Sequence, residues 1–158
     1  MIERYISAKI VFCTLQELSD TEKMLVEHAL LMSEKAYAPY SGFKVGAACL
    51  LENGCVVTGS NQENAAYPAG TCAERTALFH ANANHPDQPV LLLAVAAQNK
   101  NGFVLDPIAP CGICRQVLLE IEQRYNKPIR IVLYGAKEIA IFERASDLLP
   151  FSFGVKSL

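Results

Sequence analysis

The chain has 158 residues, of which 51% are hydrophobic and 19% are charged, and 14 lysines and arginines against 16 aspartates and glutamates give a net charge of -2. This length suits one domain with a core of its own, and the charge argues against a nucleic-acid partner, because a phosphate backbone requires a basic surface. Neither a signal peptide nor a membrane span is evident, so we expect a cytoplasmic protein with no membrane partner.

The N-terminal part predicts an extension followed by a helix. Apolar residues within positions 2–12 indicate a short strand or an irregular arm, and we treat residues 1–17 as an N-terminal extension. Ser19 or Asp20 is a suitable cap for a helix over about residues 21–37, where apolar side chains recur at helical spacing.

A β-hairpin is the next predicted element. Asn53-Gly54 is a strong signal for a two-residue turn between two strands. Such a turn would pair Cys49 with Thr58 and would place Cys49 and Cys55 on opposite faces of the sheet. These two cysteines could then form no disulfide, and a reducing compartment fits the cysteine pattern best.

The rest of the chain alternates between helices and strands. We expect helices over about residues 72–83 and 112–125. The five expected strands cover residues 44–51, 55–61, 90–97, 129–134 and 138–142. Because the strands are apolar on both faces, layers should cover the sheet on both sides. The pattern predicts the α/β class, as a three-layer α/β/α sandwich with a mixed central sheet of about five strands.

Three cysteines have the spacing of a metal site. Cys111 and Cys114 form a Cys-x-x-Cys pair at a predicted helix start, and Cys72 begins another predicted helix. Thiolates suit zinc, and three protein ligands leave one position open, as in catalytic rather than structural sites. The alternative is a closed structural site, but His80 lies about 12 Å along the helix from Cys72 at ~1.5 Å per residue and is too far to be the fourth ligand.

Charged residues accompany these cysteines. Glu74 stands two residues after Cys72, where it could handle the protons of a metal-bound water. Its alternative role is a capping carboxylate in the first turn of a helix. Two helix N-termini, together with Arg75 and Arg115, would offset the negative charge of three thiolates. For Arg115, a structural role at the surface is the alternative.

Several motifs together resemble the small, homotetrameric type of cytidine deaminase. They are YSGFKVGAA at 40–48, NQENAAYP at 61–68, CAER at 72–75, PCGICRQ at 110–116 and LLPFSFG at 148–154. The resemblance covers about residues 18–158, which would be the catalytic domain. It implies a zinc-dependent hydrolase that converts cytidine and deoxycytidine to uridine and deoxyuridine with release of ammonia, in pyrimidine salvage. Zn²⁺ would be its cofactor and Glu74 its catalytic residue.

The resemblance also implies how a nucleoside substrate is held. Asn61 and Glu63 would bind the ribose, Phe43 would stack near the base, and the backbone N–H of Ala73 would meet the base carbonyl. Hydrogen bonding within the loop is the alternative for Asn61 and Glu63, and core packing is the alternative for Phe43.

In the resembled family, neighbouring subunits complete each active site. Tyr67 and Phe153 are the matching candidates here, so we expect a homotetramer with shared sites. Three other functions stay open: a deaminase of another aminopyrimidine nucleoside such as blasticidin S, a polynucleotide cytosine deaminase, and a non-catalytic, zinc-stabilised interaction module. The acidic charge balance argues against the second, and the presence of Glu74 with only three ligands argues against the third.

Overall fold

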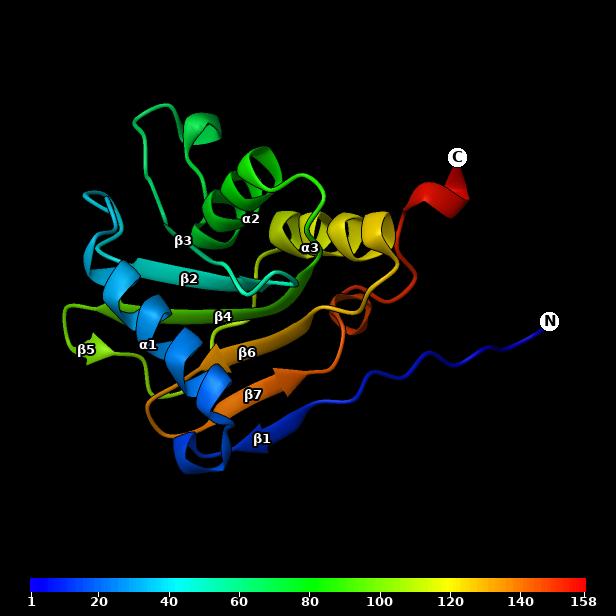
Figure 1. Cartoon of the computed structure of the whole chain (residues 1–158), viewed down its shortest axis with the longest axis horizontal. Helices are drawn as coiled ribbons and strands as arrows, with labels where there is room; N and C mark the ends of the chain where they lie inside the picture. The colour runs from blue at the N-terminus through cyan, green and yellow to red at the C-terminus, as the bar shows by residue number, and fades with distance from the viewer.

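A mixed β-sheet forms the middle of the molecule (Figure 1). The computed structural model describes residues 1–158, except for the side chain of Lys156. The strands are β1 (Val11–Cys13), β2 (Lys44–Leu51), β3 (Val56–Ser60), β4 (Val90–Asn99), β5 (Gly102–Phe103), β6 (Arg130–Tyr134) and β7 (Ile139–Phe142). Their order is β1-β7-β6-β4-β2-β3, with β5 paired to β4. Only β4 and β6 pair in parallel. The five predicted strands are present, β1 lies at the end of the region expected to be a short strand or an arm, and β5 is a short addition.

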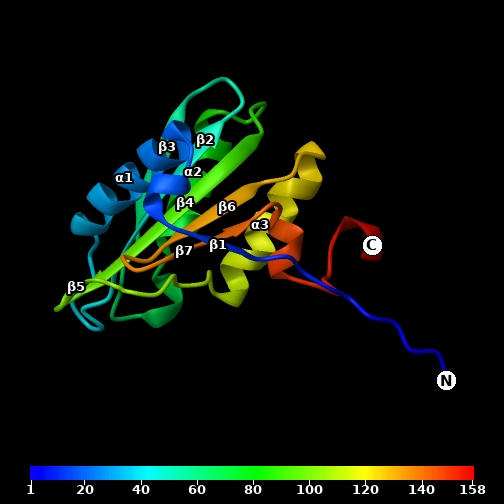
Figure 2. The same cartoon turned by 90° about the horizontal axis from the view of Figure 1, so that it is seen from below.

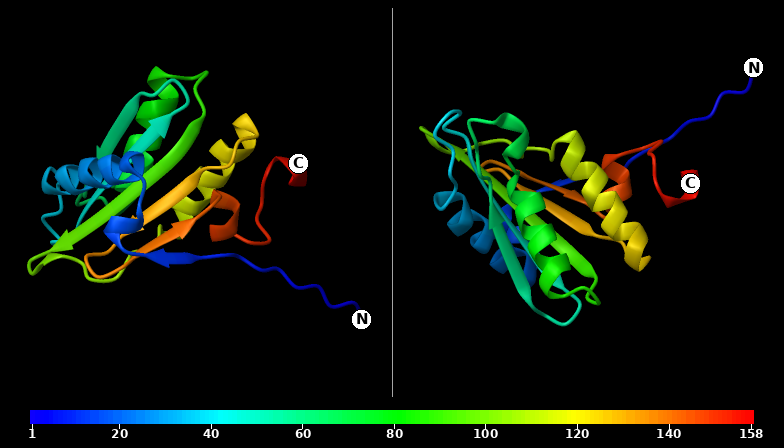
Figure 3. Two further views of the ribbon diagram at one scale, coloured as in Figure 1. Left: turned by 60° about the horizontal axis from the view of Figure 1, so that its bottom comes forward. Right: turned by 90° about the horizontal axis from the view of Figure 1, so that it is seen from above.

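Helices cover both faces of this sheet (Figures 2 and 3). Helix α1 (Asp20–Glu34) lies on one face, and α2 (Ala73–Asn84) and α3 (Gly112–Tyr125) lie on the other. Each face has its own apolar cluster: one contains Leu25 and Val26 of α1, the other Leu78 of α2 and Leu118 of α3. The predicted three-layer α/β/α sandwich is therefore confirmed.

Two glycines let helices lie directly on the sheet. A Cβ added at Gly46 of β2 would overlap the backbone carbonyl oxygen of Ala29 in α1. A Cβ added at Gly59 of β3 would overlap the backbone nitrogen of Ala77 in α2. Gly59 thus sets how closely α2 approaches the sheet, and the residue that caps α2 is Cys72.

Helix α1 is shorter than the sequence predicted. It ends at Glu34 rather than near residue 37. The N–H of Tyr37 donates to the carbonyl oxygen of Asn61 at 3.1 Å, and the carbonyl oxygen of Tyr37 accepts from the N–H of Glu63 at 2.8 Å. Pairing with this distant segment requires an extended chain at Tyr37, which a helix could not provide.

The hairpin between β2 and β3 also differs from the prediction. The N–H of Leu51 donates to the carbonyl oxygen of Cys55 at 2.9 Å, and Gly54 has a φ of 84°. This is a three-residue loop closed by a left-handed glycine, not a two-residue turn. The register is consequently one residue away from the prediction, and Cys49 lies opposite Val57. The prediction that Cys49 and Cys55 lie on opposite faces rested on the two-residue turn and is wrong with it, because Cys55 lies opposite Leu51. All six cysteines are nevertheless free in the structure.

Both chain ends project from the same end of the molecule (Figure 1). Residues 1–10 are exposed and lead into β1, which pairs antiparallel with β7 at the edge of the sheet. The predicted extension therefore contains an edge strand. At the other end, the 3-10 helix η3 (Ala145–Leu148) is followed by an irregular segment and by the short 3-10 helix η4 (Val155–Ser157).

Candidate metal centre and active site

A cavity of about 720 Å³ opens beside the N-terminus of α2. Its walls come from the loop before β2, the segment after β3, the start of α2 and the loop before α3. The volume falls in the range of roughly 300–1,000 Å³ that small-molecule sites occupy. The residues in its walls that the sequence had singled out are Phe43, Asn61, Glu63, Tyr67, Cys72, Ala73, Glu74, Arg75 and Cys111.

Three cysteine sulfurs converge at this cavity. Cys72 and Cys111 are the N-cap residues of α2 and α3, and Cys114 lies in the first turn of α3. Both motifs therefore lie at helix starts, as predicted. The Sγ of Cys111 is 3.8 Å from that of Cys72 and 3.5 Å from that of Cys114, and all three lie within 4.8 Å of one another.

These distances fit a zinc ion. Ligand sulfurs at about 2.3 Å from a tetrahedral zinc lie about 3.8 Å from each other. The three sulfurs could therefore close on one ion with little movement. A fourth position would remain for a ligand from the cavity, whose wall includes Cys72 and Cys111.

The three thiols are not electrostatically equivalent. The Cys114 thiol, as the largest influence, lowers the pKa of Cys72 to about 5, against the opposing effect of burial. The Arg75 guanidinium and the Cys111 thiol add to this lowering. The hydrogen bond with Cys72 raises the pKa of Cys114 in turn, because Cys114 is the partner that keeps its proton. Cys72 is thus ready to bind zinc as a thiolate, the form that a metal requires.

The two arginines near the thiols have different contacts. Arg75 Nη2 donates to the carbonyl oxygen of Gly70 at 3.3 Å, while its Nε is buried without a partner among the described residues. Arg115 donates from Nε to the carbonyl oxygen of Pro110 at 2.8 Å and from Nη1 to that of Leu148 at 3.0 Å. Arg75 is therefore placed for the predicted electrostatic role, whereas the contacts of Arg115 are those of its structural alternative.

Glu74 lies in the first turn of α2 and is only 5% exposed. Burial raises the pKa of its carboxyl, and the negative charge of the Cys72 thiolate raises it further. A carboxyl with a raised pKa takes up a proton more readily than a solvated one, as a general acid and base must. The position of Glu74 therefore suits a general acid and base rather than a solvated helix cap.

The polar groups of Asn61 and Glu63 face the cavity but also brace its walls. Asn61 Oδ1 accepts from the N–H of Val45 at 2.7 Å, and its Nδ2 donates to the carbonyl oxygen of Phe43 at 2.9 Å. Glu63 accepts from the hydroxyl of Ser41 at 2.5 Å and from its N–H at 3.3 Å. Each side chain retains lone pairs, and Asn61 one N–H, for a ligand. The sequence reasoning missed Ser41, for which its place two residues before Phe43 in a loop was the available signal.

The remaining candidates are placed unequally. Ala73 is the first residue of α2, so its N–H has no acceptor within the helix and is free for a ligand in the cavity. Tyr67, which we expected to serve a neighbouring subunit, lies in the wall of the cavity of its own chain. Phe153 is 64% exposed and is not among the residues that line this cavity.

A family model now identifies the kind of site. The model of the cytidine and deoxycytidylate deaminase zinc-binding region matches residues 19–127, which is more than half of the chain and includes the three thiols and Glu74. The chain belongs to the cytidine and deoxycytidylate deaminase family. The resemblance found in the sequence is thereby confirmed.

Individual relatives agree with this assignment over almost their whole length. The cytidine deaminase of Halalkalibacterium halodurans is 41% identical over 137 residues, covering 86% of this chain and 96% of the relative. That of Mycobacterium tuberculosis is 40% identical over 140 residues, covering 85% and 91%. The crystal structure of cytidine deaminase from Burkholderia pseudomallei matches with a TM-score of 0.72 at 41% identity, covering 86% of this chain and 100% of that one.

Proposed function

We propose that this chain is a zinc-dependent hydrolase that converts cytidine and deoxycytidine to uridine and deoxyuridine and releases ammonia. The observation that carries the proposal is the group of three cysteine sulfurs at two helix N-termini, beside the buried Glu74 in the wall of a small-molecule cavity. The family membership and the cytidine deaminases among its relatives support it.

The chain would divide the chemistry between the thiols and Glu74. Cys72, Cys111 and Cys114 would hold zinc, which when bound acts as a Lewis acid and lowers the pKa of a water. Glu74 takes one proton from the attacking water and delivers it to N3 of the cytosine ring, and it then takes the second proton, from the hydroxyl formed on C4, and delivers it to the leaving amine. The raised pKa of Glu74 helps here, because the carboxyl has to hold a proton between these steps.

The substrate would be bound along the remaining walls of the cavity. Asn61 and Glu63 use their free hydrogen-bonding capacity for the sugar hydroxyls, Phe43 packs against the base, and the N–H of Ala73 donates to the base carbonyl. Hydrogen bonds from Ser41 hold the pKa of Glu63 below its ordinary value, so this residue is charged and disfavours a phosphate nearby.

We further infer a homotetramer in the cytoplasm, with active sites completed by Phe153 and Tyr67. The exposure of Phe153 on a segment outside its own cavity supports the sharing of sites. Six free cysteines are in keeping with a reducing compartment. None of the helices in the described part of the chain meets the length and hydropathy of a transmembrane segment.

A panel of substrates assayed for ammonia release tests this assignment. We expect cytidine and deoxycytidine to have specificity constants at least about tenfold above those of cytosine and of cytidine 5'-monophosphate, because sugar contacts supply binding energy at the transition state. Equal constants for cytosine and cytidine would contradict the role of Asn61 and Glu63. Turnover of blasticidin S alone would favour the antibiotic deaminases, and no turnover by a zinc-loaded chain would favour a non-catalytic module.

A further inference from the structure

The C-terminal segment, residues 145–158, lies beside α3 (Figures 1 and 3). Two glutamines of this helix contact it. Gln116 Nε2 donates to the carbonyl oxygen of Phe153 at 3.0 Å, and Gln123 Oε1 accepts from the N–H of Val155 at 3.3 Å. Between these bonds, a Cβ added at Gly154 would lie 2.6 Å from Gln123 Oε1. The backbone of the segment therefore lies directly against the side chains of α3.

The start of the same segment is also anchored to α3. Arg115 Nη1 donates to the carbonyl oxygen of Leu148 at 3.0 Å. The carboxylate of Glu122 accepts from the N–H of Ala145 at 2.7 Å and from that of Ser146 at 3.2 Å. One helix thus binds the segment before and after its exposed turn, and the N-terminus of that helix carries two of the three candidate zinc ligands.

We propose that Gln116 and Gln123 are positioning residues that hold the C-terminal segment on α3 and so present Phe153 to the active site of a neighbouring subunit. This inference rests on the proposed function, in which Phe153 contacts the substrate of a neighbour. A segment that was not held in this way would lose its conformational freedom at each docking, at a cost to substrate binding. The exposed ring of Phe153 is free for such a contact, because only its backbone is used by Gln116.

The two glutamines bind the segment through different atoms of their side-chain amides, Gln116 through Nε2 and Gln123 through Oε1, and this difference allows a specific test. Gln116 is a donor and Gln123 is an acceptor. Gln116→Met and Gln123→Met keep the length of the side chain and remove the hydrogen bond. Gln123→Glu keeps an accepting oxygen and should behave as the parent does. Glu120→Met is the matched control on α3, because Glu120 makes no side-chain hydrogen bond or ion pair with the described residues.

We expect each methionine variant to lower kcat/KM for cytidine by about 3- to 10-fold, the usual effect of one hydrogen bond. Gln123→Glu and Glu120→Met should stay within about twofold of the parent, and all four variants should keep their zinc. Loss of activity in Gln123→Glu equal to that in Gln123→Met would overturn the proposal. Gln123 lies more than two helical turns from Cys114, the nearest candidate zinc ligand. If Gln116→Met binds zinc poorly, Gln123→Met therefore still tests the proposal.

A double-mutant cycle decides whether the glutamines act through Phe153. Phe153→Ala should itself lower kcat/KM by about tenfold or more. In that background, Gln116→Met should change kcat/KM by less than about twofold, because the side chain that it positions is gone. Equal losses in both backgrounds would overturn the positioning role. A fully active Phe153→Ala chain would instead remove Phe153 from the shared site, and the positioning role with it, while cytidine turnover itself would still stand.

Discussion

Glu74 combines burial with a position in the cavity wall, and its role can be separated from that of the thiols. Glu74→Gln keeps the size and hydrogen-bonding capacity of the side chain but cannot take up a proton. We expect turnover to fall by roughly 10²- to 10⁴-fold, with zinc still bound. Rates with cytidine and elemental analysis of the same preparation provide the check. A rate within about tenfold of the parent would remove Glu74 from the proton transfer.

At the residue scale, the sequence predicts what is local and misses what is not. Cys72, Glu74 and the Cys111–Cys114 pair stand in two short motifs, and each motif includes the start of a helix that has local signals. The bond between Ser41 and Glu63 joins two loops, 22 residues apart. No periodicity connects such residues, so only the folded chain brings them together.

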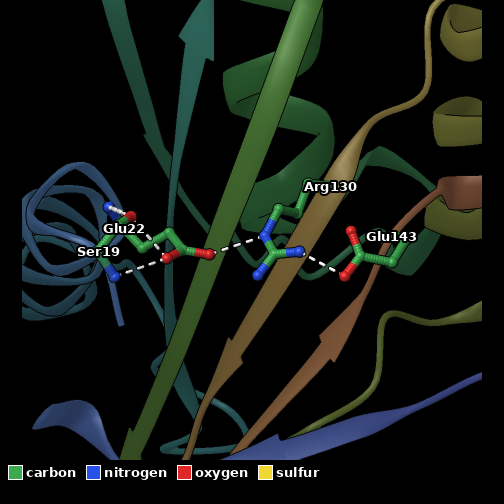
Figure 4. A network of polar contacts seen from close by, with 4 residues as sticks. All are labelled: Ser19, Glu22, Arg130 and Glu143. Carbon is green, nitrogen blue, oxygen red and sulfur yellow. Dashed lines mark hydrogen bonds and ion pairs between the residues drawn. The ribbon is translucent and has the colours of Figure 1, made fainter. Parts of the chain in front are cut away.

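An arginine links helix α1 to the sheet (Figure 4). Arg130 of β6 donates from Nε to Glu22 at 2.7 Å and from Nη1 to Glu143 at 2.5 Å. The side chain of Glu22 is 8% exposed and also accepts from the N–H and hydroxyl of Ser19, the cap of α1. The side chain of Glu143 is 54% exposed. The two ion pairs of Arg130 should therefore differ in their contribution to stability.

We expect Glu22→Gln to lower the free energy of unfolding by about 1–3 kcal/mol, and Glu143→Gln by less than about 1 kcal/mol, as measured in urea. Burial alone would raise the pKa of Glu22, but the hydrogen bonds from Ser19 and Arg130 outweigh it and hold this pKa below its ordinary value. The contribution of Glu22 is thus present near neutral pH and is lost as the pH falls through the lowered pKa. Equal costs for the two variants would mean that burial does not decide between the pairs.

At the element scale, the three helices and the five main strands follow from apolar patterning, but their ends do not. Helix α1 stops early because Tyr37 pairs with the segment after β3. The loop closed by Gly54 adds one residue to the hairpin, and that residue shifts the register. The pairing of β1 with β7 joins opposite ends of the chain, and no nearby residue signals it.

The shared active site is a property of the whole assembly, and mixed oligomers can test it. A Phe153→Ala chain and a Glu74→Gln chain, each strongly impaired alone, are dissociated together and reassociated. If sites are shared, some mixed sites combine an intact Glu74 from one chain with an intact Phe153 from another, and activity partly returns. The control is the same mixture without dissociation. If demonstrably mixed oligomers show only background activity, Phe153 acts within its own subunit and the sites are not shared.

At this largest scale, sequence patterns alone say little. Composition and patterning predict one α/β domain, and the sheet order confirms the class while adding connections that no local signal predicts. The contact of Gln116 with Phe153 spans 37 residues and depends on where α3 and the C-terminal segment meet in space. Our expectation of a tetramer comes from the family resemblance, because a single chain does not carry the surfaces of its neighbours.

The central claim is that cytidine deamination depends on zinc held by the three thiols. The direct measurement is the loss of cytidine absorbance by the purified chain before metal removal, after removal by a chelator, and after zinc is restored. We predict turnover that disappears with the metal and returns with about one zinc per chain, while Cys111→Ser is not restored at the same zinc concentration. Full turnover by the metal-free chain, or an inactive chain with zinc bound at all three thiols, would contradict the account.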